Sequence, residues 1–351
     1  MQIQENVPLA PLTTLGVGGN ARFFVEVRTE TEGCDALSWA SERNLPLFVL
    51  GGGSNVVIGD RGFPGLVLKM AIRGVESGSE NGNRIFWAGA GEPWDPFVLR
   101  TISEHLPGLV LLSGIPGTVG GTPIQNVGAY GTEVATSIRA VRALDRRDGR
   151  IVELSPHACA FGYRRSIFNA EAKGCYLVLA VCYSLSQDRM PELRYPDLLS
   201  FFSKKDKPAS PEEIREAVLQ IRRSKAMVLA ADEEDSRSVG SFFKNPILES
   251  APFAELLSRA EKRGLTPPSY PESGGKRKVP AAWLVENAGF PKGFRRASIG
   301  ISKRHALAIV NRGGATASEI IAFMGEIQNA VEAIFAVRLQ PEPVFVGFES
   351  C

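Results

Sequence analysis

The sequence predicts an α+β protein with more than one domain. The chain has 351 residues, which is enough for two or three domains. In its first half, short apolar runs typical of strands alternate with longer helix-like segments. A polar, proline-containing stretch at 187–210 then indicates a domain junction.

The first segment has a strand–helix–strand order. Residues 21–27 (ARFFVEV) favour a strand, and 31–43 favour a helix. Residues 45–50 (LPLFVL) form a short apolar run that ends in glycines, as a buried strand leading into a loop would. Residues 65–70 supply a further strand. We therefore expect a small α/β unit here.

Residues 84–186 have a mixed pattern. We expect one helix at 93–105 and strands at 138–144 and 176–185. A glycine-rich loop at 114–131 interrupts this region. The pattern predicts a second lobe built around that loop.

Helix-capping signals mark the C-terminal half. Ser210 can cap a helix, Pro211 suits its first turn, and Glu213 can complete a capping box, so a helix is expected to about Lys225. An acidic loop (DEEDSRS) follows. Further elements are expected as helices at 252–263, 280–287 and 316–336, the last capped by Thr316 with Glu319, a strand at 305–311 and an extended segment at 338–347.

Composition excludes several classes of protein. The formal net charge of +2 gives no reason to expect a nucleic-acid or membrane surface. No apolar run approaches the ~20 residues of a membrane span, and the N-terminus lacks the features of a secretion signal. The five cysteines show no paired metal spacing, and the three histidines are far apart. We expect a cytoplasmic protein with reduced cysteines and no metal centre.

Three glycine-rich segments point to a large phosphate-bearing cofactor. They are 15–20 (LGVGGN), 50–55 (LGGGSN) and 114–131 (GIPGTVGGTPIQNVGAYG). Successive main-chain amides in such loops form anion sites that suit a pyrophosphate. No G-x-G-x-x-G segment lies between a strand and a helix, so a Rossmann nucleotide site is not indicated.

Four other segments combine reactive side chains with glycine, aromatic or proline neighbours. They are 162–166 (GYRRS), Tyr195 in LRYPDLL, 240–246 (GSFFKNP) and 340–343 (QPEP). Each also has an ordinary structural explanation, such as a surface ion pair, a turn or a solvated glutamate. Taken singly, none of them establishes catalysis.

Together, in order, these segments resemble a known family. LGVGGNA, LGGGSN, SGIPGTVGGTPIQNVGAYG, YRRSIF, GSFFKNP, HALAIVN and PEPVF resemble the UDP-N-acetylenolpyruvoylglucosamine reductases (UDP-N-acetylmuramate dehydrogenases) of bacterial cell-wall synthesis over nearly the whole chain. The resemblance implies a vanillyl-alcohol-oxidase-like (PCMH-type) FAD-binding fold of two α/β subdomains, 1–70 and 71–205. A C-terminal α+β substrate-binding domain is implied at 206–351, whose last strand is expected to return to the flavin site.

The resemblance also implies the reaction. FAD would be bound non-covalently, since no histidine lies near the second glycine loop, and NADPH would be the co-substrate. NADPH would reduce the flavin and leave before UDP-N-acetylglucosamine enolpyruvate enters and is reduced to UDP-N-acetylmuramate, which implies ping-pong kinetics. Hydride attack on the double bond places negative charge on the neighbouring carbon and its carboxylate. The site therefore needs an acid and a source of positive charge.

The resemblance assigns three catalytic residues. Arg164 would bind the substrate carboxylate, because a guanidinium stays charged and can grip it with two parallel donors. Ser241 would donate the proton, and Glu342 would stabilise the enolate-like species, with a raised pKa or a strong compensating partner. We expect these three to converge over the flavin.

The remaining site residues follow from the same matching. Substrate binding would involve Tyr195, Lys225, Asn245 and His305, although His305 stands where some relatives carry glutamine and could be an ordinary strand residue. Two departures are a longer 226–239 segment and Arg165, which stands where an acidic residue is common. Cofactor binding would involve Gly51, Gly52, Gly53, Ser54, Asn55, Ser113, Gly114, Pro116, Gly117, Gly120, Gly121, Gln125, Asn126, Gly128, Ala129 and Tyr130.

Two alternatives stay open. A flavin oxidase or dehydrogenase of the same fold, acting on an alcohol or lactone, would explain the glycine loops but not GSFFKNP or Glu342. A flavin- or nucleotide-binding module without turnover is the other. For the partners we expect a small-molecule UDP-sugar and a monomeric chain, with neither nucleic acid nor membrane involved.

Overall fold

The computed structural model describes residues 1–203, 209–230 and 233–348, and its contacts divide the chain into two units. Unit 1 comprises Met1–Val7, Ala21–Gly53 and Phe63–Val228. Unit 2 comprises Pro8–Asn20, Ser54–Gly62 and the chain from Leu229 onward. Each unit has its own hydrophobic core. The division into three domains stays a prediction.

The first sheet of unit 1 has the predicted strand–helix–strand order. Its strands are β1 (Gln4–Pro8), β2 (Asn20–Val27), β5 (Phe63–Met70) and β3 (Leu47–Leu50), in the order β1-β2-β5-β3. Both β2 and β3 run parallel to β5. Helix α1 (Glu30–Glu42) connects β2 to β3, and the ring of Trp39 packs edge-on against Phe23 at 5.1 Å.

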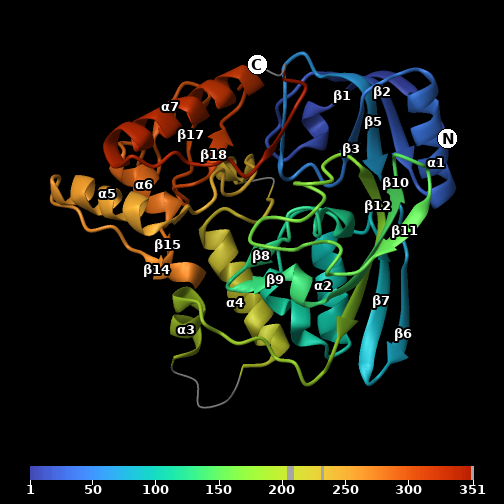
Figure 1. Ribbon diagram of the computed structural model, residues 1–351, viewed down its shortest axis with the longest axis horizontal. Coiled ribbons are helices and arrows are strands. Elements are labelled where there is room, and N and C mark those ends of the chain that lie inside the picture. The colour runs from blue at the N-terminus through green and yellow to red at the C-terminus, as the bar shows by residue number, and fades with distance from the viewer. Residues whose placement is uncertain (204–208, 231–232, 349–351) are drawn as a thin grey trace. The chain divides into compact units, whose positions relative to one another are not determined.

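The second sheet of unit 1 is antiparallel and carries the third glycine loop. Its strands are β6 (Val75–Glu80), β7 (Asn83–Gly89), β10 (Ile138–Asp145), β11 (Ile151–Leu154) and β12 (Tyr176–Leu185), in the order β11-β10-β12-β7-β6. Helix α2 (Trp94–Ser103) covers one face (Figure 1), where Phe97 contacts Phe86 at 5.9 Å and Tyr183 at 5.1 Å. Short elements join the sheet to the loop: η2 (Pro107–Leu112), η3 (Val119–Gly121), β8 (Gly128–Ala129), β9 (Thr132–Glu133) and η4 (Val134–Thr136).

Helix α4 (Pro211–Ser224) begins with the predicted capping box. The hydroxyl of Ser210 accepts from the Glu213 amide, and the Glu213 carboxylate accepts from the Ser210 amide. Its buried face, Ile214, Ala217 and Val218, belongs to the core of unit 1. In the division by contacts, α4 belongs to unit 1, which ends at Val228.

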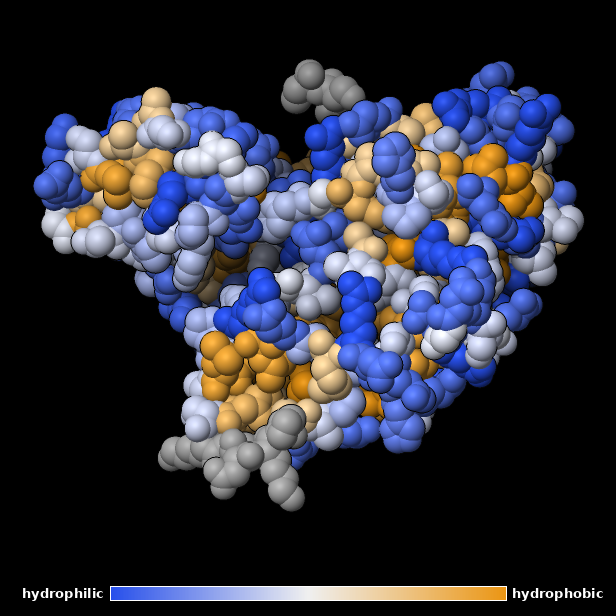
Figure 2. All heavy atoms as spheres, turned by 60° about the horizontal axis from the view of Figure 1, so that its bottom comes forward, coloured by the Kyte–Doolittle hydropathy of each residue, from blue (hydrophilic) through white to orange (hydrophobic). Residues whose placement is uncertain are grey.

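Helix α3 (Pro196–Phe202) lies within the stretch whose composition indicated a domain junction, where no helix was predicted. The apolar run that follows Pro196 is short, and one side chain, Leu198, is fully buried. Leu199 and Phe201 are exposed, and Figure 2 shows a hydrophobic area over this helix. Residues 204–208 of the same stretch lie outside the described residues.

Among the residues that the structure describes, unit 2 consists of short strands, short 3-10 helices and the helices α5, α6 and α7. Its elements are η1 (Ala10–Leu12), β4 (Val56–Ile58), η5 (Glu234–Ser236), β13 (Ile247–Leu248), α5 (Ser250–Glu261), β14 (Tyr270–Pro271), η6 (Ser273–Gly275), β15 (Arg277–Lys278), α6 (Ala281–Asn287), β16 (Arg295–Arg296), β17 (Ile299–Ile301), β18 (Ile309–Asn311), α7 (Ala317–Phe335) and β19 (Val344–Val346). The capping box predicted for α7, Thr316 with Glu319, is confirmed.

The strand predicted at 305–311 is wrong at its start. Residues before Ile309 form a turn in which the Ala308 amide donates to the His305 carbonyl at 3.1 Å.

Two N-terminal segments belong to unit 2 because of contacts distant in sequence. Strand β19 pairs in parallel with β4, with Val344 opposite Val56. The Asp60 carboxylate accepts from the amides of Ala317 and Ser318 at 2.7 and 2.9 Å, at the positive end of the α7 dipole. Burial opposes ionisation of Asp60, but a hydrogen bond from the Ser318 hydroxyl and the two amide bonds outweigh it and lower its pKa.

Candidate functional site

Two of the predicted glycine loops touch in unit 1. A Cβ atom added to Gly52 would lie 2.5 Å from the Cα of Gly117, so only glycine permits this approach. Gly117 has φ +128°, and its carbonyl accepts from the Trp94 amide at 3.1 Å. The Gly120 amide donates to the Ala90 carbonyl at 2.9 Å. The loop is thereby fixed to the end of β7 and the start of α2.

An unpaired hydroxyl lies where these loops meet. Thr118 Oγ1 is buried and makes no hydrogen bond among the described residues. It would lie 3.2 Å from a Cβ added to Gly51. Since buried polar groups are normally paired, a ligand oxygen is the natural partner. The loops therefore fit the phosphates of a bound cofactor.

Several predicted cofactor residues use their polar groups within the protein. The amides of Ser113, Gly114, Gly120 and Gly121 donate to Val110 O, Asp95 Oδ1, Ala90 O and Thr118 O. Asn126 donates from Nδ2 to Glu133 and to the Gly162 carbonyl. We infer that these five shape the loop. Unit 1 also holds Gly51, Gly52, Gly53, Pro116, Gly117, Gln125, Gly128, Ala129 and Tyr130, whereas Ser54 and Asn55 belong to unit 2.

Asp95 anchors the glycine loop to two helices. Its carboxylate accepts from the Gly114 amide at 2.6 Å and from both terminal nitrogens of Arg215 at 2.7 Å. Burial opposes ionisation of Asp95, but these hydrogen bonds outweigh it and lower its pKa below the ordinary value of 3.8. The bidentate pair joins α2 to α4 beneath the loop.

The substitution Asp95→Asn should lower the free energy of unfolding at pH 7 by about 1–3 kcal/mol, because Arg215 then loses its charged partner. A carboxylate whose pKa is lowered by folding stabilises the protein above the unfolded pKa. It loses that contribution as the pH falls through the folded value. In thermal unfolding, the variant should therefore have a lower melting temperature than the native protein at pH 7, and this difference should narrow below about pH 4. A difference that is constant with pH would contradict the ion-pair role.

Arg164 lies beside the third glycine loop in a strained backbone conformation. Its φ is +53°, which is uncommon for a residue other than glycine and frequent at functional sites. Its Nη2 donates to the Gly128 carbonyl at 3.0 Å, and its own carbonyl accepts from Asn169 Nδ2 at 3.1 Å. The structure thus brings Arg164 into contact with the predicted cofactor residue Gly128, and Asn126 bonds the nearby Gly162 carbonyl.

Tyr130, Tyr195 and Lys225 form a second group in unit 1. The two tyrosine rings meet edge-on at 5.4 Å, and Lys225 Nζ lies 6.0 Å from the centre of the Tyr195 ring. Burial raises the pKa of Tyr130, which hydrogen-bonds Arg222. Lys225 Nζ also pairs with Asp197 Oδ2 at 2.6 Å. A substrate phosphate at Lys225 would therefore compete with this carboxylate.

Ser241, His305 and Glu342 come together in unit 2. The Ser241 hydroxyl lies 3.0 Å from His305 Nε2. The next residue, Phe242, donates its amide to the Leu307 carbonyl at 2.8 Å and accepts from the Glu342 amide at 2.9 Å. Backbone hydrogen bonds on both sides of Phe242 thus place the predicted proton donor next to the segments that carry the histidine and the glutamate.

Asn55 and Asn245 lie close to the same segments. Asn55 Nδ2 donates to the Glu342 carbonyl at 3.4 Å, and the Asn55 carbonyl accepts from the Val344 amide at 3.0 Å. Asn245 Oδ1 accepts from the Ala281 amide at 2.9 Å, at the first turn of α6. The side-chain oxygen of Asn245 therefore has a structural task, whereas its predicted contact with substrate stays a prediction. Arg164 belongs to unit 1, so its convergence with Ser241 and Glu342 also stays a prediction.

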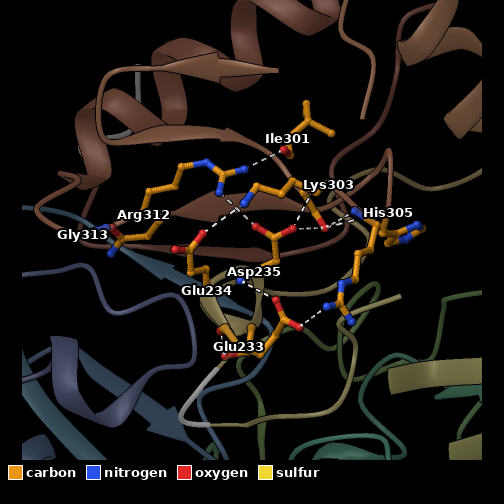
Figure 3. Close-up of polar contacts among 12 residues, drawn as sticks. Glu233, Glu234, Asp235, Ile301, Lys303, His305, Arg312 and Gly313 are labelled. Atoms are coloured by element: carbon orange, nitrogen blue, oxygen red, sulfur yellow. Dashed lines mark hydrogen bonds and ion pairs between the residues drawn. The ribbon is translucent and has the colours of Figure 1, made fainter. Parts of the chain in front are cut away.

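The two departures from the family pattern have partners of their own. Arg165 pairs with Glu171. In the longer 226–239 segment, Asp235 is 2% exposed and pairs with Arg312 at 3.1 Å, which is 9% exposed. Asp235 Oδ2 also accepts from the Ser302 hydroxyl at 2.8 Å (Figure 3). The sequence analysis predicted only an acidic loop here and did not indicate this network. Asp232 lies outside the described residues.

A metal site and a membrane-spanning helix are both absent from the described residues. Among the residues that the structure describes, no group of three or more histidine, cysteine or acidic side chains could hold a metal ion. Within those same residues, no helix combines the length and apolar character needed to cross a membrane.

Comparisons with known proteins show which proteins the chain is similar to. A model of the C-terminal domain of UDP-N-acetylenolpyruvoylglucosamine reductase matches residues 232–346, and an FAD binding domain model matches 21–155. The proteins named UDP-N-acetylenolpyruvoylglucosamine reductase from Thermobifida fusca and Streptomyces coelicolor are each 42% identical, covering 98% and 99% of this chain and 98% and 91% of their own. The crystal structure of the Thermus caldophilus reductase aligns with a TM-score of 0.65 at 26% identity, covering 99% of each chain. These matches confirm the predicted α+β, FAD-binding fold class.

Proposed function

Because the chain belongs to the UDP-N-acetylenolpyruvoylglucosamine reductase family, we propose that it reduces UDP-N-acetylglucosamine enolpyruvate to UDP-N-acetylmuramate, using NADPH and FAD, in peptidoglycan precursor synthesis. The observation that carries this proposal is 42% identity over nearly the full length of both chains. The match of residues 232–346 to the reductase C-terminal domain disfavours an alcohol or lactone oxidase.

The glycine loops of unit 1 fit FAD. Gly51, Gly52, Gly117 and Thr118 would hold its phosphates, with the Thr118 hydroxyl supplying a donor. When bound, FAD would supply hydride transfer to the double bond of the substrate, with NADPH as the source of the two electrons. Side chains of this protein would stabilise the developing charge, donate the proton and bind the substrate.

Three residues would stabilise the negative charge that develops on the substrate and supply the proton. Arg164 would bind the carboxylate that takes up negative charge, and at ~4 Å with an effective dielectric of ~20 this pairing contributes ~4 kcal/mol before desolvation. Ser241 would donate a proton to the internal carbon. Glu342 would stabilise the enolate-like species as a hydrogen-bond donor, which requires its carboxyl to be protonated. The contacts around Phe242 that link the segments of Ser241 and Glu342 support this assignment.

Four residues would position the substrate. Tyr195 and Lys225 lie together in unit 1, where the lysine would meet the diphosphate of the UDP-sugar. Asn245 and His305 lie in unit 2. The edge-on packing of Tyr195 on Tyr130 supports a role for this tyrosine close to the third glycine loop.

The visible spectrum tests the function directly. The purified protein with FAD should be yellow, and it should bleach when NADPH is added without oxygen. The colour should return with UDP-N-acetylglucosamine enolpyruvate, but not with a ketone that an alcohol oxidase would form. A colourless protein that takes up no FAD, or a bleached protein that the enolpyruvyl sugar does not reoxidise, would overturn the proposal.

We also propose that the chain acts as a monomer in the cytoplasm. The formal net charge of +2 supports the absence of a nucleic-acid partner. Cys34, Cys159, Cys175 and Cys182 form no disulfide, as expected for a reducing compartment. Light scattering after gel filtration should give a mass near 37.9 kDa, and twice that mass would contradict the proposal.

A further inference from the structure

The contact between Ser241 and His305 provides a route for a proton. A serine hydroxyl is a weak acid, so a site that uses one must return its proton at the moment it is lost. His305 Nε2 lies 3.0 Å from Ser241 Oγ, within the distance for direct transfer. Histidine is also the side chain whose ordinary pKa allows it to give and regain a proton near neutral pH.

We propose that His305 is the acid that reprotonates Ser241, and that Asp235 holds it in position. The proposal rests on the proposed function and assigns His305 a task different from substrate binding. It also explains the longer 226–239 segment, because Asp235 lies within it.

The transfer balances as follows. As a C–H bond forms at the internal carbon, the O–H bond of Ser241 breaks. The Nε2–H bond of His305 breaks at the same time, and a new O–H bond forms on Ser241. The two electrons that reduce the substrate come with the hydride and ultimately from NADPH, so NADPH is oxidised. His305 ends neutral and regains a proton from water.

The turn at 302–305 is fixed by hydrogen bonds. The Ser302 hydroxyl donates to Asp235 Oδ2 at 2.8 Å and accepts from the amides of Arg304 and His305 at 3.0 and 3.2 Å. The Lys303 amide donates to the same carboxylate oxygen at 2.6 Å. Figure 3 shows this network joining η5 to the turn. Asp235 is therefore a positioning residue that acts through Ser302.

The acidic residues of η5 and its N-terminal neighbour also balance the positive charge around the histidine. Lys303 pairs with Glu234 at 3.3 Å, and Arg304 pairs with Glu233 at 3.1 Å. The titratable and charged groups of the elements around His305 are Lys303 and Arg304 on its own turn, Glu233, Glu234 and Asp235 at η5, Arg312 after β18, Lys244 beyond Ser241, and Glu342. Because Lys303, Arg304 and Arg312 are each paired with an acidic residue, their positive charge opposes a protonated His305 less than unpaired cations would.

The test separates the two half-reactions. Anaerobic stopped-flow absorbance would follow reduction of the FAD-loaded protein by NADPH, then reoxidation by UDP-N-acetylglucosamine enolpyruvate. His305→Gln should leave the first rate unchanged and lower the limiting rate of the second by about 10- to 100-fold. The half-saturating substrate concentration should stay within about twofold. The matched control is His157→Gln, an exposed histidine of unit 1, which should leave both rates unchanged.

Three outcomes would count against the relay. A higher half-saturating concentration with an unchanged limiting rate would make His305 a binding residue. An unchanged second half-reaction would remove it from the reaction altogether. In the native protein the limiting rate should fall as the pH rises through the pKa of His305, and persistence of that fall in His305→Gln would assign it to another group. A native protein that the sugar fails to reoxidise would instead overturn the proposed function.

Nuclear magnetic resonance can test the contact between Ser241 and His305 without turnover. With three histidines in the chain, ring resonances can be assigned by comparing the native protein with His305→Gln and His157→Gln. Ser241→Ala should shift the pH titration of the His305 ring and leave that of His157 in place. Asp235→Asn should broaden or shift the His305 resonances if the network holds the ring. An unchanged His305 titration in Ser241→Ala would overturn the proposal, even if His305→Gln fails to fold.

Discussion

Replacing Ser241 with alanine should slow turnover about a thousandfold while leaving the reduction of bound FAD by NADPH at its native rate. Proton donation by a positioned side chain typically contributes ~10²- to 10⁴-fold. The hydroxyl that lies 3.0 Å from His305 Nε2 would be lost, whereas the backbone bonds around Phe242 need no side chain at position 241. The measurement is anaerobic stopped-flow absorbance of each half-reaction. Ser258→Ala, on an exposed turn of α5, is the matched control.

The double variant Ser241→Ala with His305→Gln sharpens this result. If the histidine acts only through the serine, the double variant should be about as slow as Ser241→Ala alone. Residues that act as a unit show this kind of non-additivity. If the rate loss of the double variant instead equals the product of the two single-variant losses, Ser241 and His305 have separate roles. A Ser241→Ala variant with native turnover would remove serine from proton donation altogether.

Local signals predicted local structure well. The two capping boxes, at Ser210 with Glu213 and at Thr316 with Glu319, involve residues three apart, and both are confirmed. Strand β12 runs over 176–185 as predicted, because its apolar residues are bounded by polar ones on either side. Helix α3 was missed, since one fully buried leucine in a polar stretch gives almost no periodic pattern.

Contacts between distant residues could not be predicted in this way. The Asp60 carboxylate accepts from the Ala317 amide in the first turn of α7, 257 positions further along the chain. No local sequence pattern indicates that contact. The buried pair of Asp235 with Arg312 is similar, because both residues look solvated in the sequence. Such pairs decide which segments belong to which unit, and composition alone does not indicate that α4 packs into the core of unit 1.

The candidate site shows the same limit. Glycine content predicted three cofactor loops, of which two lie close together in unit 1, whereas residues 15–20 belong to unit 2. The resemblance predicted Ser241 and Glu342, whose segments are joined in unit 2. Neither source indicated that the Ser113 and Gly120 amides are used within the protein, nor that Thr118 would carry an unpaired hydroxyl. The contact of His305 with Ser241 depends on a turn that sequence assigned to a strand.

The substitution Gly52→Ala should weaken FAD binding about 100-fold. The added methyl group would lie 2.5 Å from Gly117 Cα and 3.0 Å from Gly117 C, and backbone atoms cannot rotate away as a side chain can. Overpacking of this kind costs ~1–3 kcal/mol, which corresponds to about a 5- to 150-fold change in affinity. We expect the upper end, because the displaced loop also carries Thr118 and the amide of Gly120.

The measurement for Gly52→Ala is FAD content after purification, followed by titration of the apoprotein with FAD. Gly78→Ala is the matched control, since no atom lies within 4 Å of its added Cβ and its φ is not in the positive region. Both variants should fold, because the methyl group at Gly52 strains one contact between loops and leaves the sheets of unit 1 intact. Since FAD must bind before either half-reaction, Gly52→Ala should regain turnover when FAD is added in large excess. A Gly52→Ala protein that purifies with its full complement of FAD would show that the loops do not need this close approach to hold the cofactor.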